Sequence, residues 1–160
     1  FPSIRRTHGY RYSTKVTRLA MPDYMADTGE REQIRAENRK AADRILQLCR
    51  ENGAQLLLVE LPTVTSWNAA RHRGVAEFAV ARELEFLDLN LLYDQMGLDG
   101  AVAFRDAGNH LNVTGATAVT AYLGRYIARR YRLPDLRGNS RYANRQEEWV
   151  CYRRFVNGNV

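Results

Sequence analysis

A short, continuous apolar segment that follows an amphipathic helix constrains this sequence more than any other feature. Between residues 30 and 51 apolar side chains recur every three or four positions, and Gly53 follows as a C-terminal stop signal. The next residues, AQLLLVEL at 54–61, form an apolar run that ends at Pro62. A run this short and apolar is typical of a strand buried on both faces of a parallel sheet. The two segments together predict an α/β fold.

The same pattern recurs further along the chain. Helical spacing predicts a second helix near 67–83, for which Ser66 is a candidate N-cap, and EFLDLN at 85–90 predicts a second strand. A strand, a helix and a further strand predict two adjacent parallel strands with a right-handed crossover. A third helix is expected from about Val113 to Tyr131.

The remaining segments carry weaker signals. Residues 1–30 are expected to form an irregular lead-in, and residues 134–160 a helical tail. We interpret the 160 residues as a single α/β domain. Because the chain begins with Phe1 and not with Met, we expect a processed or truncated product.

Composition excludes several classes of protein and partner. With 45% apolar and 26% charged residues, the chain matches a globular protein and not a disordered or fibrous one. The net charge is 24 − 18 = +6, but the basic residues are spread along the chain. No nucleic-acid-binding motif surrounds the arginines of the third predicted helix, so we interpret them as a solvated face. These arginines are Arg125, Arg129, Arg130 and Arg132.

Metal, cofactor and membrane signals are also missing from the sequence. Cys49 and Cys151 lie in no metal-binding pattern, so no metal or cofactor is predicted, and the question of a disulfide stays open. No stretch approaches the roughly 20 apolar residues of a membrane-spanning helix, and the first residues lack the apolar core of a signal peptide.

A ligand site in an open parallel sheet lies beyond the carboxyl ends of the strands, here after Leu61 and Leu89. In the first of these loops, PTVTSWN, two interpretations are open. Thr63, Thr65 and Trp67 contact a substrate, or Ser66 caps the helix while Trp67 packs in the core.

His110 is the histidine with the clearest chemical context. It stands at a loop-to-helix junction, four residues after Asp106 and beside Asn109 and Asn112. An acid at this position holds the imidazole in one tautomer and raises its basicity. The alternative is a capping loop, because aspartate and asparagine are also common turn and N-cap residues.

Other candidate residues have simpler interpretations. His72 lies in an arginine-rich stretch, RHR, and is expected to be solvated, while His8 lies in an unpatterned segment. The sequence Gly138-Asn139-Ser140 is interpreted as a turn. Three further serines lack the glycine and strand context of a nucleophile: Ser3, Ser13 and Ser66.

The run FRDAGNHLNVTGATAVTAYLGRYI resembles the last conserved block of the SGNH/GDSL hydrolase superfamily. The match extends upstream through LLLVELP, Trp67, FLDLN and YDQMGLDG, over about residues 31–145. These segments look like the C-terminal portion of the bacterial envelope-associated branch, which includes relatives of proteins that acylate wall polymers. The resemblance implies a three-layer, flavodoxin-like parallel sheet with flanking helices.

The resemblance also implies a function. The chain would belong to an SGNH-type serine esterase or O-acyltransferase, located in the cell envelope or secreted, that acts on an ester such as an acylated surface polysaccharide. His110 would be the general base and Asp106 would orient it. Thr63, Trp67 and Asn112 are the expected substrate contacts.

Two features depart from the family pattern. Three residues separate Asp106 from His110 where the family usually has two, so the loop must absorb one residue. No Gly-Asp-Ser-like block is identifiable, so the serine and the oxyanion donors are expected outside these 160 residues. The alternative function is a non-catalytic α/β module, a degenerate relative that binds a glycan or a protein.

Overall fold

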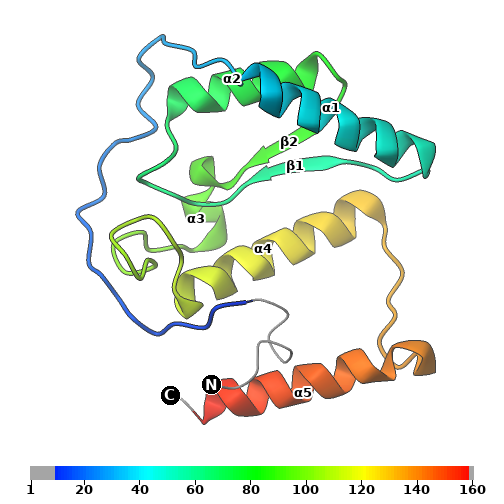
Figure 1. The fold of residues 1–160 in the computed structure, drawn as a ribbon. Helices are drawn as coiled ribbons and strands as arrows, with labels where there is room; N and C mark the ends of the chain where they lie inside the picture. The colour runs from blue at the N-terminus through cyan, green and yellow to red at the C-terminus, as the bar shows by residue number, and fades with distance from the viewer. Residues whose placement is uncertain (1–9, 159–160) are drawn as a thin grey trace. The chain divides into compact units, whose positions relative to one another are not determined.

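The computed structural model describes residues 10–158 of the chain. Its elements in chain order are α1 (Ala36–Glu51), β1 (Leu57–Glu60), α2 (Ala69–Val80), β2 (Glu85–Asp88), the 3₁₀ helix η2 (Leu89–Leu91), α3 (Tyr93–Met96), α4 (Val113–Tyr131), the 3₁₀ helix η3 (Ser140–Tyr142) and α5 (Ala143–Asn157) (Figure 1). Helices and a parallel pair of strands alternate, so the fold is α/β.

The two strands form a small parallel sheet. β1 and β2 pair from Leu57 opposite Glu85 to Glu60 opposite Asp88, which confirms the predicted adjacency and direction of the strands. α2 connects them and lies with α1 on one side of the sheet (Figure 1). The carboxyl ends of both strands therefore meet at one edge, where Asp88 and the loop after β1 lie side by side.

β1 is less buried than its sequence predicts. The strand covers four residues, all of intermediate exposure, and Leu61 just beyond it is 50% exposed. Within residues 10–158 β1 pairs only with β2, so its other edge has no neighbouring strand. An apolar run is fully buried only when strands or helices cover it on all sides. The expectation of a strand buried on both faces is therefore wrong for this structure.

α1 begins later than the periodicity predicts because the preceding residues have another role. Residues 27–33, here called the strap, lie along α2. The Glu32 amide donates to the Ala70 carbonyl (3.0 Å), and Arg31 forms an ion pair with Glu77. A Cβ on Gly74 would lie 1.8 Å from the Glu32 carbonyl oxygen, so this close approach requires glycine in α2.

The helix boundaries follow local capping rules, with one correction. α4 spans Val113–Tyr131 as predicted, and Gly53 ends α1 with a positive φ of 63°. The N-cap of α2 is Asn68, whose side chain accepts from the Arg71 amide (2.9 Å), and not Ser66.

The chain divides into two compact units. One comprises residues 14–122 and contains the sheet, while the other combines residues up to Ser13 with the chain from Leu123 onward. In the second unit Tyr10 packs edge-on against Tyr152, and Tyr12 packs edge-on against Phe155. Among the helices that the structure describes, none is long and apolar enough to span a membrane.

Candidate functional site

His110 is held in a tight loop between two paired residues, Phe104 and Leu111. Phe104 and Leu111 form an antiparallel bridge, and the Arg105 amide donates to the His110 carbonyl (3.0 Å). Phe104 is completely buried. The segment between Phe104 and Leu111, residues 105–110, is here called the His110 loop, and its closure fixes the position of the histidine.

Within this loop Asp106 and His110 form a dyad. One carboxylate oxygen accepts from the His110 amide (2.6 Å), and the other lies 2.6 Å from the imidazole Nδ1. The predicted hydrogen bond is therefore present, and the same carboxylate also binds a backbone amide of the loop. With Nδ1–H facing a carboxylate, a neutral imidazole keeps its lone pair on Nε2. The His110 side chain is 56% exposed.

Asp106 stays ionised easily in this setting. Burial disfavours the charged form, but the hydrogen bonds from the His110 amide and imidazole and the charge of Arg105 outweigh it. The pKa of Asp106 therefore lies below its ordinary value. The ionised carboxylate remains a hydrogen-bond acceptor for the His110 amide and ring.

The His110 loop contains two consecutive residues in left-handed conformations. Ala107 has a φ of 57° and Gly108 a φ of 98°. Glycine adopts such angles at little cost, whereas alanine does so only when its surroundings require it. This turn brings the His110 ring back to Asp106 despite the three intervening residues.

The His110 loop rests on the loop between β1 and α2, residues 61–68, here called the β1–α2 loop. The Val64 amide donates to the Gly108 carbonyl (2.7 Å), and the Thr65 hydroxyl donates to the Asn109 side chain (3.1 Å). The dyad therefore lies beside the carboxyl end of β1, as expected for an α/β sheet.

The structure gives the predicted substrate contacts other roles. Asn112 is 1% exposed and caps α4 by accepting from the Gly115 amide (3.0 Å), while its amide group donates to the Val102 carbonyl (2.7 Å). Thr63 is buried, and its hydroxyl lies 2.9 Å from that of Ser66. In this structure Asn112 and Thr63 make internal hydrogen bonds, and a role in binding substrate stays a prediction for both.

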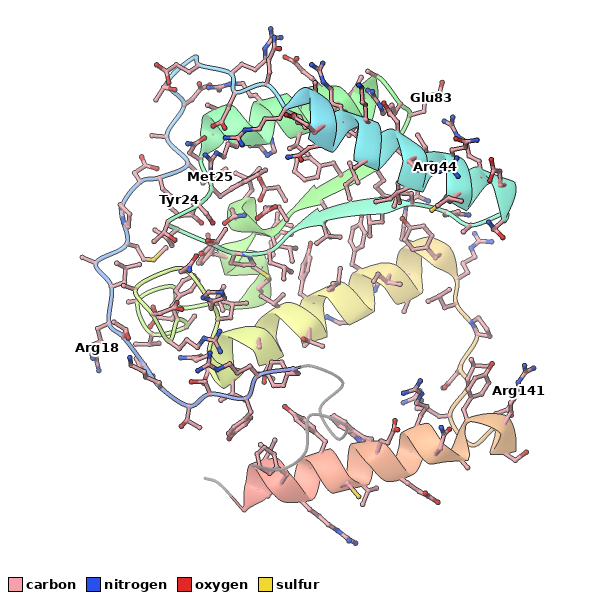
Figure 2. The ribbon with its side chains drawn as sticks, viewed as in Figure 1. Arg18, Tyr24, Met25, Arg44, Glu83 and Arg141 are labelled. Atoms are coloured by element: carbon pink, nitrogen blue, oxygen red, sulfur yellow. The ribbon has the colours of Figure 1, made fainter. Side chains whose placement is uncertain are left out.

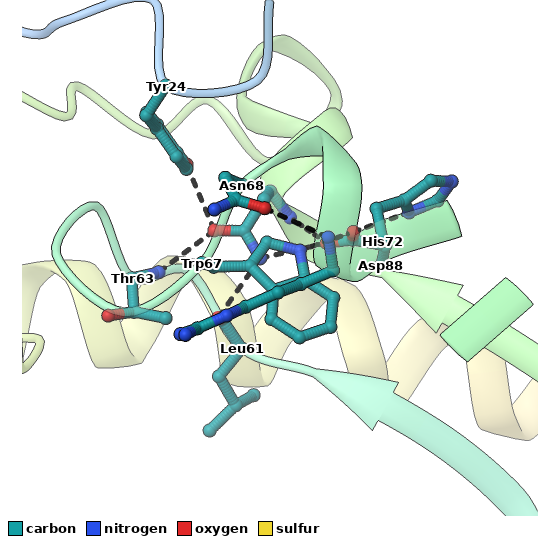
Figure 3. A network of polar contacts seen from close by, with 9 residues as sticks. Tyr24, Leu61, Thr63, Trp67, Asn68, His72 and Asp88 are labelled. Carbon is teal, nitrogen blue, oxygen red and sulfur yellow. Dashed lines mark hydrogen bonds and ion pairs between the residues drawn. The ribbon is translucent and has the colours of Figure 1, made fainter. Parts of the chain in front are cut away.

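Trp67 is directed toward a buried carboxylate. Its indole N–H donates to Asp88 (2.8 Å), and the same oxygen lies 2.7 Å from Nδ1 of His72. The other oxygen accepts from the backbone amide of Asn90 (2.9 Å) and from its side chain (2.8 Å). We call these four residues the Asp88 cluster (Figure 3). The Asp88 side chain is 1% exposed, and its four hydrogen bonds offset the cost of burying a charge.

His72 was predicted to be solvated, and the structure corrects this. Its neighbours Arg71 and Arg73 bind the strap through Glu32 and Asp27, while the His72 ring turns to Asp88 and lies beside Phe86. The two arginines of RHR therefore contact the strap, whereas the histidine between them contacts the end of β2. The signal in the sequence for this contact is the polar end of FLDLN, because Asp88 is the last residue of β2 and Asn90 follows it in η2.

Two acidic groups meet at this edge of the sheet. Glu60 pairs with Asp88 in the strand register, and burial together with the Asp88 charge raises the pKa of Glu60. Burial also raises the pKa of Tyr24, as does the neighbouring Tyr93 hydroxyl. Proton-binding groups are thus concentrated where the strands end.

The remaining candidates carry no additional chemistry. In the described part of the chain no group of three acidic, histidine or cysteine side chains is arranged to hold a metal ion. Cys49 and Cys151 are both free in this structure. Gly138-Asn139-Ser140 forms a turn whose Asn139 side chain accepts from the Arg141 amide. Ser3 and His8 lie outside the described residues.

No protein-family model, curated protein or solved structure matches this chain.

Proposed function

We propose that this chain carries the histidine and aspartate of an SGNH-type serine esterase or O-acyltransferase. Its substrate would be an ester, such as an acyl group on a surface polysaccharide. The proposal includes a three-layer, flavodoxin-like architecture, to which the parallel pair β1–β2 and its flanking helices would belong. The observation that carries it is the 2.6 Å contact between Nδ1 of the half-exposed His110 and Asp106.

In the proposed mechanism a serine from outside these 160 residues attacks the ester carbonyl. As the Oγ–C bond forms, Nε2 of His110 takes the serine proton, and it then gives that proton to the departing alcohol as the C–O bond breaks. Water or an acceptor hydroxyl next attacks the acyl-serine while Nε2 of His110 takes its proton. His110 then gives this proton to the serine Oγ as the bond between Oγ and the acyl carbon breaks. Asp106 holds the imidazole in the required tautomer throughout.

The chain contains a natural control for this proposal. His72 and Asp88 form a second dyad, with an Nδ1-to-carboxylate distance of 2.7 Å. In either dyad, substitution of histidine by asparagine keeps a side-chain N–H donor near the carboxylate but removes the base. His110→Asn and His72→Asn are therefore matched variants.

The experiment uses the longer protein encoded by the same reading frame, with p-nitrophenyl acetate as substrate and a fluorophosphonate probe that labels activated serines. We expect His110→Asn to lower kcat by about 10³-fold or more and to abolish labelling. We expect His72→Asn to remain within about threefold of wild type. A wild-type protein that is inert, or whose rate does not respond to His110→Asn, would favour the non-catalytic binding module.

A further inference from the structure

We propose that Asn90 is a positioning residue for the His110 site. Its side chain sets the path of the β1–α2 loop on which the His110 loop rests. This inference depends on the proposed function only for its catalytic consequence, because its structural part concerns two loops of this chain.

The His110 loop and the β1–α2 loop are in direct contact. Val64 donates to Gly108 (2.7 Å), and a Cβ on Gly108 would lie 2.8 Å from the Cβ of Val64. Thr65 adds a hydrogen bond to Asn109, the residue before His110. Any displacement of Val64 and Thr65 is therefore transmitted to the residues that precede the imidazole.

The Asn90 side chain holds the β1–α2 loop in place. Pro62 has no N–H and cannot donate a backbone hydrogen bond. The carbonyl of Leu61 before it and the amide of Thr63 after it are the flanking backbone groups that can bind a side chain. Asn90 bonds to both, since its amide nitrogen donates to Leu61 (3.2 Å) and its oxygen accepts from Thr63 (2.9 Å) (Figure 3). One side chain from the end of β2 thus holds the chain on both sides of the proline.

Two further hydrogen bonds, to Asp88 and Tyr24, orient the Asn90 side chain. Asp88 accepts from its amide nitrogen (2.8 Å), and the Tyr24 hydroxyl donates to its oxygen (2.9 Å). Tyr24 comes from the irregular N-terminal segment (Figure 2). These bonds and the two to the β1–α2 loop use both donors and both acceptor positions of the amide. Asn90 is only 6% exposed, so no other residue type of this size satisfies all four partners.

The decisive variant is Asn90→Asp, which keeps the shape of the side chain. It replaces the amide nitrogen, which donates both hydrogen bonds, by one carboxylate oxygen that faces the Asp88 carboxylate and the Leu61 carbonyl. Asn90→Ser is the milder second variant if the first does not fold, because its hydroxyl is too short to reach both sides of Pro62. The control is Asn68→Ala, which removes the α2 cap at the other end of the same loop.

The first measurement is amide hydrogen exchange of the 160-residue chain. We expect the Val64 amide to exchange at least about 10-fold faster in the Asn90 variants, because its hydrogen bond to Gly108 opens locally. The Ala116 amide in α4 should not change, and Asn68→Ala should leave Val64 unaffected. Unchanged Val64 protection, or equal acceleration of Val64 and Ala116, would overturn the positioning role.

The second measurement is the kinetics of the longer protein with p-nitrophenyl acetate. We expect the Asn90 variants to lose about 10- to 100-fold in kcat, with KM within about threefold of wild type, because the base is misplaced while binding persists. Asn68→Ala should keep kcat within about twofold. Faster Val64 exchange with an unchanged kcat overturns the catalytic consequence alone, whereas an inert wild-type protein overturns the proposed function.

Discussion

Gly108 is a residue of the His110 loop that packs directly against the β1–α2 loop. Its φ of 98° is rarely accessible to alanine, and an added Cβ would lie 2.8 Å from the Val64 side chain. We expect Gly108→Ala to lower the free energy of unfolding by about 3 kcal/mol, from backbone strain and overpacking together. Chemical denaturation measures this difference.

Gly97→Ala is the control for this substitution. Gly97 also has a positive φ, of 62°, but an added Cβ would meet no atom within 4 Å. It therefore reports the backbone cost alone, about 1 kcal/mol. Equal losses in the two variants would mean that close packing of the loops contributes nothing.

The ionisation of Asp106 makes a pH-dependent contribution to stability. The pKa of Asp106 in the folded state lies below the ordinary value of 3.8. Between these two values the folded state therefore binds fewer protons than the unfolded state. The contribution is present above about pH 4 and is lost as pH falls through the folded pKa. We expect the stability difference between wild type and Asp106→Asn to shrink from pH 5 to pH 3. A difference independent of pH would contradict the role of the His110 hydrogen bonds.

At the scale of the elements, two glycines of α4 distinguish packing from helix propensity. A Cβ on Gly115 would lie 2.6 Å from the Ala103 carbonyl oxygen, whereas one on Gly124 would meet nothing within 4 Å. We expect Gly115→Ala to destabilise the protein by about 1–3 kcal/mol and Gly124→Ala to stabilise it by about 0.5–1 kcal/mol. Thermal denaturation followed by circular dichroism tests both. A stabilising Gly115→Ala would show that the loop before α4 does not pack as described.

At the scale of the whole molecule, the proposed base His110 lies in these 160 residues and the proposed serine nucleophile lies outside them. Without a positioned serine, Asp106 and His110 have no proton to remove, and covalent catalysis is lost. We expect the 160 residues alone to hydrolyse p-nitrophenyl acetate no faster than the same chain with His110→Ala. A clear His110-dependent rate would instead identify a nucleophile among its own serines, which include Ser13, Ser66 and Ser140.

The sequence by itself determined the features that depend on neighbouring residues. Periodicity and stop signals predict α1 and α4, the two parallel strands follow from their short apolar runs, and the spacing of Asp106 and His110 predicts their hydrogen bond. Each of these depends on interactions across a few positions or on the general geometry of strand–helix–strand units.

Only the tertiary structure decided which polar side chains meet. His72 and Asp88 are 16 residues apart, and Thr63 and Asn90 are 27 apart, so no local pattern indicates either contact. No local pattern indicates the contact of the strap with α2 either. Glu32 bonds to Ala70 there, and α1 therefore begins only at Ala36. The physical reason is burial. A carboxylate such as Asp88 is stable inside the protein only where the fold brings several donors to it, and those donors come from separate segments of the chain.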